Sequence, residues 1–108
     1  MKQESRDKKL PPFHYRVYRI LRSVPRGKVT TYRALARAAG SPRASRAVGS
    51  AMNRNPYAPA VPCHRVVRSD GSVGGFARGT REKARMLAKE GVEIRNGRID
   101  LARFGWKK

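Results

Sequence analysis

Cysteine, histidine and acidic residues are scarce in this chain, whose 108 residues include one cysteine, two histidines and seven aspartates and glutamates together. A lone cysteine excludes an internal disulfide framework. No apolar run approaches the length that spans a bilayer, and the polar start lacks the apolar segment of a secretory signal. These absences favour a cytoplasmic protein, and the chain length suits one domain with a modest core.

Positive charge is what the chain has in excess. Lysine and arginine number 26, which gives a formal net charge of +19 and a sequence pI of about 11.6. A charge of this size favours polyanionic partners and opposes self-association. We therefore expect a monomer whose leading partner is nucleic acid rather than a membrane.

The first eleven residues differ in character from the rest. Residues 1–11 mix charges without periodicity and end in two prolines, which predicts a flexible basic tail. Such a tail either adds counter-charge for phosphates or is a solvated arm without a role. The domain proper then occupies residues 12–108. It begins with apolar residues at helical spacing, namely Phe13, Val17, Ile20, Leu21 and Val24.

Two further helices follow, with a tight turn between them. Thr31 is a suitable N-cap for a helix that ends at Gly40, and Ser41 and Pro42 favour the start of a second helix that reaches about Arg54. This order indicates a helix-turn-helix. Together with the short β segments further along, it predicts a mainly α fold with small β elements, a helix-turn-helix DNA-binding domain of winged-helix-like type.

The second of these helices has two different faces. Its apolar stripe comprises Ala44, Ala47, Val48, Ala51 and Met52. The opposite side is basic and small, and comprises Arg43, Arg46, Gly49, Ser50 and Asn53. Small residues let a helix approach the DNA backbone closely, above all in the narrow minor groove. The alternative is an ordinary exposed helix of a basic protein, but the helix-turn-helix spacing and the net charge favour DNA.

The only cysteine stands beside a histidine, so Cys63 and His64 are a candidate nucleophile and its base. Prolines at 56, 59 and 62 predict a stiff, extended connection into this pair. The residues after it suggest a small hairpin between 64–68 and 72–73. The alternative is a small buried thiol whose neighbouring imidazole is a coincidence.

The last third of the chain adds a glycine-rich loop, a helix and a hairpin. The glycines around Phe76 form either a pocket wall beside the thiol or only a turn-rich loop. A helix is predicted from Thr80, as N-cap, to Gly91, and its inward residues are expected to be Ala84, Leu87 and Ala88. Glu90 falls in the last turn, which disfavours an acidic side chain, so it is either solvated or held by a cation or hydrogen-bond donor. An Asn-Gly turn predicts a hairpin across 92–99, after which Leu101, Phe104 and Trp106 are expected to dock onto the core.

Four strings carry a resemblance to a known family: VPRGKVTTYRALARAAG, SRAVGSAMNRNP, VPCHRVVRSDGSVGGF and LAKEG. They resemble the O6-alkylguanine-DNA alkyltransferases, from about Pro12 to Trp106, and PCHRV is a highly specific motif. The resemblance implies DNA repair by irreversible, single-turnover transfer of a methyl or larger alkyl group from O6 of guanine in duplex DNA. It implies base flipping, double-stranded DNA containing O6-alkylguanine as partner and no cofactor. The sequence shows no metal-ligand cluster.

Matching positions imply roles for five residues. Cys63 resembles the acceptor thiolate, His64 the base that activates it through a water, and Glu90 the acid that orients the histidine. Asn55 is similar to the hinge asparagine that ties the helix to the active-site loop. Tyr32 resembles the tyrosine whose hydroxyl meets the flipped base and assists its departure.

Further positions imply DNA contacts and a pocket. Arg46 resembles the arginine that enters the base stack in place of the flipped nucleotide, with its helix in the minor groove. The other DNA contacts we expect come from Thr31, Arg43, Ala47, Ser50 and Asn53. The expected pocket residues are Tyr32, Val66, Phe76, Ala77 and Arg78. Phe76 stands where many members have tyrosine, and the bulk of Arg78 could narrow the pocket or reach a phosphate.

Two alternatives stay open on the sequence. One is a non-catalytic alkyltransferase-like protein that flips O6-alkylguanine and flags it for other repair proteins; the short chain and the RIDLARFGW segment resemble that branch, whose members typically replace the cysteine. The other is a plain helix-turn-helix regulator or architectural protein, which explains the charge but not PCHRV or Glu90. Many family members carry an additional N-terminal domain, and the chain matches the DNA-binding, thiol-bearing part.

Overall fold

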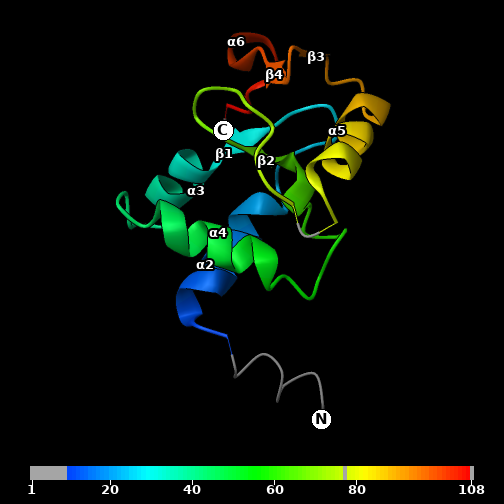
Figure 1. The fold of residues 1–108 in the computed structure, drawn as a ribbon. Helices are drawn as coiled ribbons and strands as arrows, with labels where there is room; N and C mark the ends of the chain where they lie inside the picture. Colours follow the sequence, from blue (N-terminus) through cyan, green and yellow to red (C-terminus); the bar gives the residue numbers. More distant parts are fainter. Residues whose placement is uncertain (1–9, 77, 108) are drawn as a thin grey trace.

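The computed structural model describes residues 10–76 and 78–107. All but the last two positions of the predicted tail, and the predicted pocket residue Ala77, therefore lie outside the described residues. One half of the molecule, to the left of and below the small sheet in Figure 1, packs three helices together: α2 (Pro12–Leu21), α3 (Tyr32–Ala38) and α4 (Ser45–Asn53). The other half, at the right and top of Figure 1, holds α5 (Thr80–Lys89), the hairpin of β3 (Ile94–Arg95) and β4 (Arg98–Ile99), and α6 (Leu101–Phe104).

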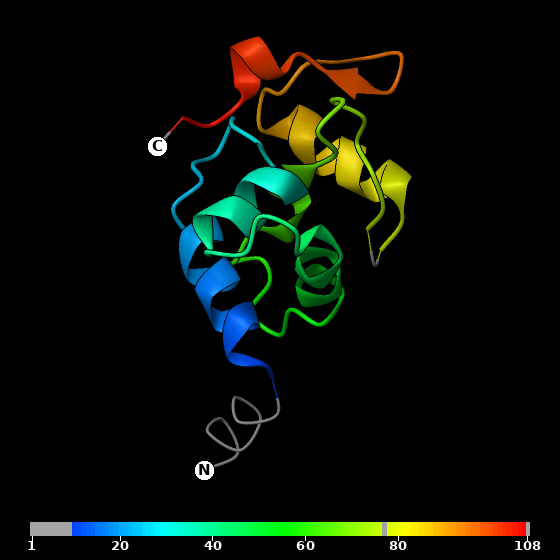
Figure 2. The same ribbon diagram turned by 90° about the vertical axis from the view of Figure 1, so that its left-hand side faces the viewer.

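The two halves meet at a small parallel sheet. Strand β1 (Thr30–Thr31) pairs with β2 (Val66–Val67), with Thr30 opposite Val66 and Thr31 opposite Val67. A 3₁₀ turn, η1 (Cys63–Arg65), runs directly into β2. The predicted mainly α fold with small β elements is confirmed, and Figure 2 shows the same two halves from the side.

Each half has its own apolar core. The core of the α2–α4 half is made by buried residues of the three helices and the chain around the cysteine, chiefly Val17, Leu21, Leu35, Val48, Ala51, Val61 and Val66. The other core comprises Val29, Val67, Val73, Leu87, Val92, Ile99 and Phe104. Neighbouring residues of β2 belong to different cores because side chains alternate along a strand. The sheet therefore joins the two halves.

The helix-turn-helix forms with one boundary displaced. Thr31 caps α3 as predicted, because its hydroxyl accepts a hydrogen bond from the Ala34 amide at 3.0 Å. The prediction that α4 starts at Pro42 is wrong, since α4 starts at Ser45. The Ala44 amide donates to the Ser41 carbonyl at 2.9 Å and closes a turn, in which Pro42 takes the position that proline prefers.

The chain around the cysteine is more compact than predicted. Cys63 and His64 lie in η1, because the Arg65 amide donates to the Pro62 carbonyl at 2.9 Å. Of the hairpin expected between 64–68 and 72–73 only the turn forms, where the Gly71 amide donates to the Arg68 carbonyl at 2.9 Å and the Arg68 amide to the Ser72 carbonyl at 3.0 Å. The expected pairing of the strand is wrong: β2 pairs with β1 instead, and Ser72 forms a bridge with Arg98. The connection before it folds into turns rather than extending.

The α5 end of the chain needs two corrections. Thr80 is the first residue of α5 and not its cap; its hydroxyl donates to the Gly74 carbonyl. Ala88 is exposed, and the fully buried residues of the helix are Lys83 and Leu87. The hairpin turn is confirmed, with positive φ at Asn96 and Gly97. Phe104 docks on the second core, and Leu101 and Trp106 pack as partly buried residues.

Candidate active site and nucleic-acid interface

The thiol is accessible. Cys63 is a free, partly exposed cysteine that lines two neighbouring cavities. One, of about 280 Å³, is lined by Tyr32, Gly49, Met52, Asn53, Cys63, Arg68, Gly75 and Phe76. The second, of about 310 Å³, includes His64, Asn55, Arg78 and Met86 and has a largely apolar wall. A group that enters either cavity therefore meets the sulfur-bearing residue, and Phe76 also lines both cavities.

An imidazole and a carboxylate lie behind the thiol. His64 is 4% exposed, and its Nε2 is 2.8 Å from Oε2 of Glu90, at the C-cap of α5. Arg65 binds the same carboxylate with two hydrogen bonds, from Nε at 2.9 Å and Nη2 at 2.8 Å. A third bond joins its Nη1 to the Val24 carbonyl. Glu90 is thus held by donors rather than solvated.

These contacts set the charge of Glu90 and the tautomer of His64. Burial of Glu90 opposes its ionisation, but the hydrogen bonds from Arg65 and His64 outweigh burial and lower the pKa of Glu90 to about 2. At neutral pH the carboxylate can only accept, so Nε2 of His64 carries the proton. Nδ1 of a neutral His64 is then the nitrogen that can take a proton.

Tyr32 reaches the cavity because of the parallel sheet. It follows β1, and Arg68 follows β2, so the register of the two strands places both residues at the same end of the sheet and in the wall of the first cavity. Burial raises the pKa of Tyr32, Arg68 lowers it, and Cys63 raises it again. The net effect keeps the phenol protonated at neutral pH, and a protonated phenol is a hydrogen-bond donor.

The asparagine before the cysteine braces its loop. Asn55 donates from Nδ2 to the Val61 carbonyl at 2.9 Å, and its Oδ1 accepts from the Tyr57 amide at 2.9 Å. One side chain therefore links the end of α4 to the residues that enter η1. This bridge replaces the extended connection expected from the prolines.

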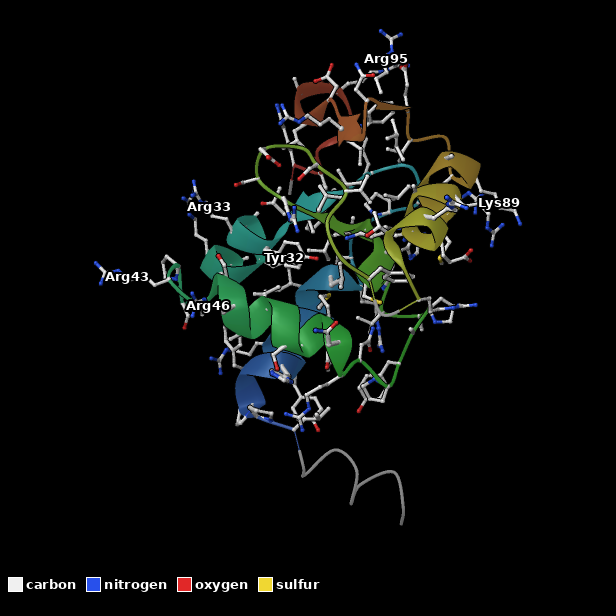
Figure 3. All side chains as sticks on the ribbon, viewed as in Figure 1. Tyr32, Arg33, Arg43, Arg46, Lys89 and Arg95 are labelled. Carbon is white, nitrogen blue, oxygen red and sulfur yellow. The ribbon has the colours of Figure 1, made fainter. Side chains whose placement is uncertain are left out.

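The outer side of the helix-turn-helix is basic. Arg33, Arg43 and Arg46 project from the same side of the molecule in Figure 3, away from Lys89 and Arg95. Ser50 and Asn53 are exposed on α4, whereas Thr31 and Ala47 are partly exposed. Of the predicted DNA contacts, Arg43 and Arg46 thus share one side of the molecule, and Asn53 lines both cavities that hold the thiol.

Two of the residues that sequence reasoning missed are charged and partly or fully buried: Arg65 and Lys83. Lys83, Leu87 and Glu90 follow the i, i+4, i+7 spacing of one helix face, which is the signal that could have located the lysine. One predicted pocket residue is not brought to the site: Val66 is fully buried in the first core and is absent from the lining of both cavities.

The described residues lack a metal-ligand group and a membrane-spanning helix. Over 10–76 and 78–107, histidine, cysteine, aspartate and glutamate form no group of three that could hold a metal ion. Within the same ranges no helix is long and apolar enough to cross a membrane.

A basic helix-turn-helix lies beside a cavity with a thiol, and an imidazole bonded to a carboxylate follows that thiol in the chain, which is an arrangement that suits a nucleic-acid-binding domain. A family model described as the DNA-binding domain of 6-O-methylguanine DNA methyltransferase matches residues 12–92. The chain belongs to this family.

Individual relatives agree with the assignment. A methylated-DNA–protein-cysteine methyltransferase of Methanothermobacter thermautotrophicus is 45% identical over 83 residues, which are 76% of this chain but 46% of that protein. A DNA base-flipping protein of Escherichia coli is 39% identical over 96% of this chain and 81% of its own length. The crystal structure of S. pombe Atl1 with DNA containing O6-carboxymethylguanine matches with a TM-score of 0.83 at 33% identity, covering 93% of this chain and 99% of Atl1. The match thus spans less than half of the methyltransferase, about four fifths of the base-flipping protein and nearly all of Atl1.

Proposed function

We propose that this protein repairs DNA directly, by moving an alkyl group from O6 of a flipped guanine to the sulfur of Cys63. The observation that carries the proposal is an accessible thiol in a cavity wall, next to a histidine whose Nε2 is 2.8 Å from a buried carboxylate. A damaged base pair opens at a cost of a few kcal/mol, less than an intact one. The 280 Å³ cavity would receive the extruded base.

The transfer needs a thiolate, a proton acceptor and a proton donor. A free thiol, with a pKa of about 8.5, is mostly protonated at neutral pH. His64 takes the thiol proton on Nδ1, through a water, while Glu90 holds its Nε2–H. The sulfur then attacks the alkyl carbon: the S–C bond forms, the C–O6 bond breaks, and its electron pair stays on guanine. The phenol of Tyr32 donates a hydrogen bond to the leaving oxygen. Because the thioether does not leave again, each molecule reacts once.

DNA would bind along the helix-turn-helix, with α4 in the minor groove. Arg46 would fill the gap left by the flipped nucleotide, and Arg43 would approach phosphates. Thr31, Ala47, Ser50 and Asn53 would line the contact, and the basic segment 1–11 would add counter-charge. Asn55 would hold the end of α4 against the loop that leads to Cys63.

A second candidate is lesion recognition without transfer. It is favoured by one observation: the E. coli relative named a DNA base-flipping protein and S. pombe Atl1 match this chain over almost its whole length. Under this alternative the protein flips O6-alkylguanine and holds it for other repair proteins. The presence of Cys63 with His64 and Glu90 favours transfer instead.

Intact-protein mass measurement separates the two. After incubation with a duplex containing O6-methylguanine, we expect a gain of one methyl group, located on Cys63 and absent in Cys63→Ser. Lesion affinity should be similar in both proteins, since the serine keeps the shape of the cavity. Tight lesion binding with no gain in mass would favour the flagging role. Equal affinity for lesion and undamaged duplex would exclude both.

A further inference from the structure

A further pocket lies against α2 and has an aromatic lining. It encloses about 260 Å³ and is lined by Tyr15, Tyr18, Arg19, Arg22 and Tyr57. None of these residues lines either cavity that holds Cys63. This tyrosine pocket, as we call it, is therefore a separate site, and the proposed alkyl transfer does not use it.

Three of the four tyrosines of the chain meet in the tyrosine pocket. The centre of the Tyr18 ring is 6.2 Å from that of Tyr15 and 5.7 Å from that of Tyr57, and both rings stand at steep angles to it, 86° and 74°. The Tyr18 hydroxyl donates to the Ala51 carbonyl at 2.8 Å, which holds this buried ring between α2 and α4. Tyr15 and Tyr57 are half-buried. The pocket thus offers aromatic surface that is already held in place.

Positive charge surrounds these rings. Arg19 and Arg22 are exposed and line the pocket, in which no aspartate or glutamate of the described chain takes part. Tyr15, Tyr18, Arg19 and Arg22 follow the i, i+3, i+4, i+7 spacing of one helix face. Burial raises the pKa of Tyr18 to about 12, and the charge of Arg54 acts against this rise, so a third cation lies near the same rings. One side of α2 is therefore both aromatic and basic.

The combination of rings and cations suits one class of ligand. Cations in the last turn stabilise a helix through its macrodipole, which accounts for the two arginines but not for three tyrosines. Aromatic rings alone also suit a proline-rich peptide, but such a peptide offers the arginines no negative charge. A nucleotide matches both parts, since bases stack on aromatic side chains and phosphates pair with guanidinium groups. The chain belongs to a family of DNA-binding domains, so the nucleotide we name is that of DNA.

We propose that the tyrosine pocket binds an unpaired nucleotide of single-stranded DNA, with its base against the tyrosine rings and the neighbouring phosphates at Arg19 and Arg22. Tyr57 directly precedes Ala58 and Pro59, which line the second cavity, so the pocket lies beside the loop that leads to Cys63. The protein thus binds a single strand in addition to the duplex along its helix-turn-helix. This second site goes beyond the proposed function and can be measured without a damaged base.

Nuclear magnetic resonance of the tyrosine rings tests the site in the whole protein. Because the chain has four tyrosines, three ring signals report the tyrosine pocket and the fourth, from Tyr32, reports the first cavity. On titration with a short thymidine oligonucleotide we expect the signals of Tyr15 and Tyr57 to shift. An abasic strand with the same number of phosphates has no base to stack and should leave these signals in place.

Three variants separate the parts of the pocket. Tyr57→Leu keeps an apolar side chain and removes the ring, so the affinity for the thymidine oligonucleotide, followed at the Tyr15 signal, should fall about tenfold. Arg22→Ala removes a partner of the phosphates and should lower the same affinity a few-fold, less so at high salt. Lys89→Ala removes the same charge from an exposed position on α5 and should leave the affinity unchanged.

Several results would overturn the proposal. Shifts confined to Tyr32 would mean that the strand enters the first cavity instead, and equal shifts with the thymidine and abasic strands would mean that the rings bind no base. Equally strong shifts of Tyr15 and Tyr57 with a glutamate peptide of the same charge would assign the pocket to an acidic protein segment. Methyl transfer needs Cys63 and not this pocket. Shifts of Tyr15 and Tyr57 in a protein that gains no methyl group from damaged DNA would therefore leave this inference standing while the proposed function fails.

Discussion

The two halves of the molecule use charge in opposite ways. Within the described residues, the α2–α4 half has an apolar core and carries its arginines outside, where Arg33, Arg43 and Arg46 share one side. The α5 half brings ionised groups into the interior, with Lys83 fully buried and Glu90 with a side chain 9% exposed. The thiol lies where the halves meet. We infer that the first half contributes recognition of a polyanion and the second sets the charges around the sulfur.

Two glutamates, Glu90 and Glu93, show the same contrast between a buried and an exposed charge. Glu90 and Glu93 each accept hydrogen bonds from two residues, and an arginine is among the partners of both. The side chain of Glu90 is 9% exposed and that of Glu93 is 38% exposed. Burial removes the competition of water and strengthens the electrostatic interaction. The two carboxylates therefore differ in environment far more than in the number of their partners.

The largest effect should come from Glu90→Gln. Glutamine replaces the two charged oxygens that Arg65 and His64 share by one neutral acceptor oxygen and an NH₂ donor, and breaking a buried pair costs about 3–5 kcal/mol. We expect the free energy of unfolding to fall by about 3 kcal/mol and methyl transfer to slow by about a hundredfold, because the histidine loses its orientation. Chemical denaturation and single-turnover kinetics measure the two. The matched control Glu93→Gln should cost under about 1 kcal/mol.

The pH dependence of stability checks the same claim. The pKa of Glu90 is lowered from 4.5 to about 2, which corresponds to about 3 kcal/mol. Because the folded-state pKa lies below the unfolded value, this stabilisation is complete above about pH 4.5 and is lost as the pH falls toward 2. The stability difference between wild type and Glu90→Gln should therefore shrink over that range. A difference that stays constant would show that the carboxylate charge is not its cause.

Local patterns in the sequence predicted the helices well and the connections poorly. Apolar spacing located α2, and the Thr31 hydroxyl located the start of α3. The pairing of β1 with β2 joins residues 36 positions apart in the chain, and no local pattern reports such a contact. The valines after Cys63 do form a strand, β2, but the backbone hydrogen bond that closes η1 precedes them, so the strand begins at Val66 and not at His64.

In the candidate site, too, the sequence indicated some residues and not others. Cys63 and His64 stood out because their residue types are rare in this chain, whereas the expected role of Glu90 came from the resemblance of its segment to the family. Arg65 and Lys83 were hidden among 26 lysines and arginines, most of which a basic protein exposes. Their identification required the path of the chain, since burial follows from the packing of α5 against η1. In so basic a chain, a lysine or arginine thus indicates a functional position only once its burial is known.

A smaller effect is expected from Arg46→Ala, which tests the recognition half alone. If Arg46 fills the gap left by the flipped nucleotide, its loss should slow transfer from duplex DNA by about tenfold, or about 1.4 kcal/mol. The reaction with free O6-benzylguanine, if the base fits the cavity, should change less than about twofold, since a free base needs no flipping. Lys89→Ala removes an exposed charge from the other half and should leave both rates nearly unchanged. Equal losses on duplex and free base would contradict the role of Arg46.

The smallest effect should come from Arg43→Ala, on the turn before α4. An arginine that only neutralises a phosphate carries no lesion preference, so affinity for damaged and undamaged duplex should fall by the same few-fold. Its signature is the salt dependence: the slope of log affinity against log salt should become shallower by about one, because one fewer counterion is released. Fluorescence anisotropy at several salt concentrations gives this slope for wild type, Arg43→Ala and Lys89→Ala. An unchanged slope for Arg43→Ala, or an equal change for Lys89→Ala, would mean that the charge on the α2–α4 half acts as a diffuse field and that DNA is not held along this face.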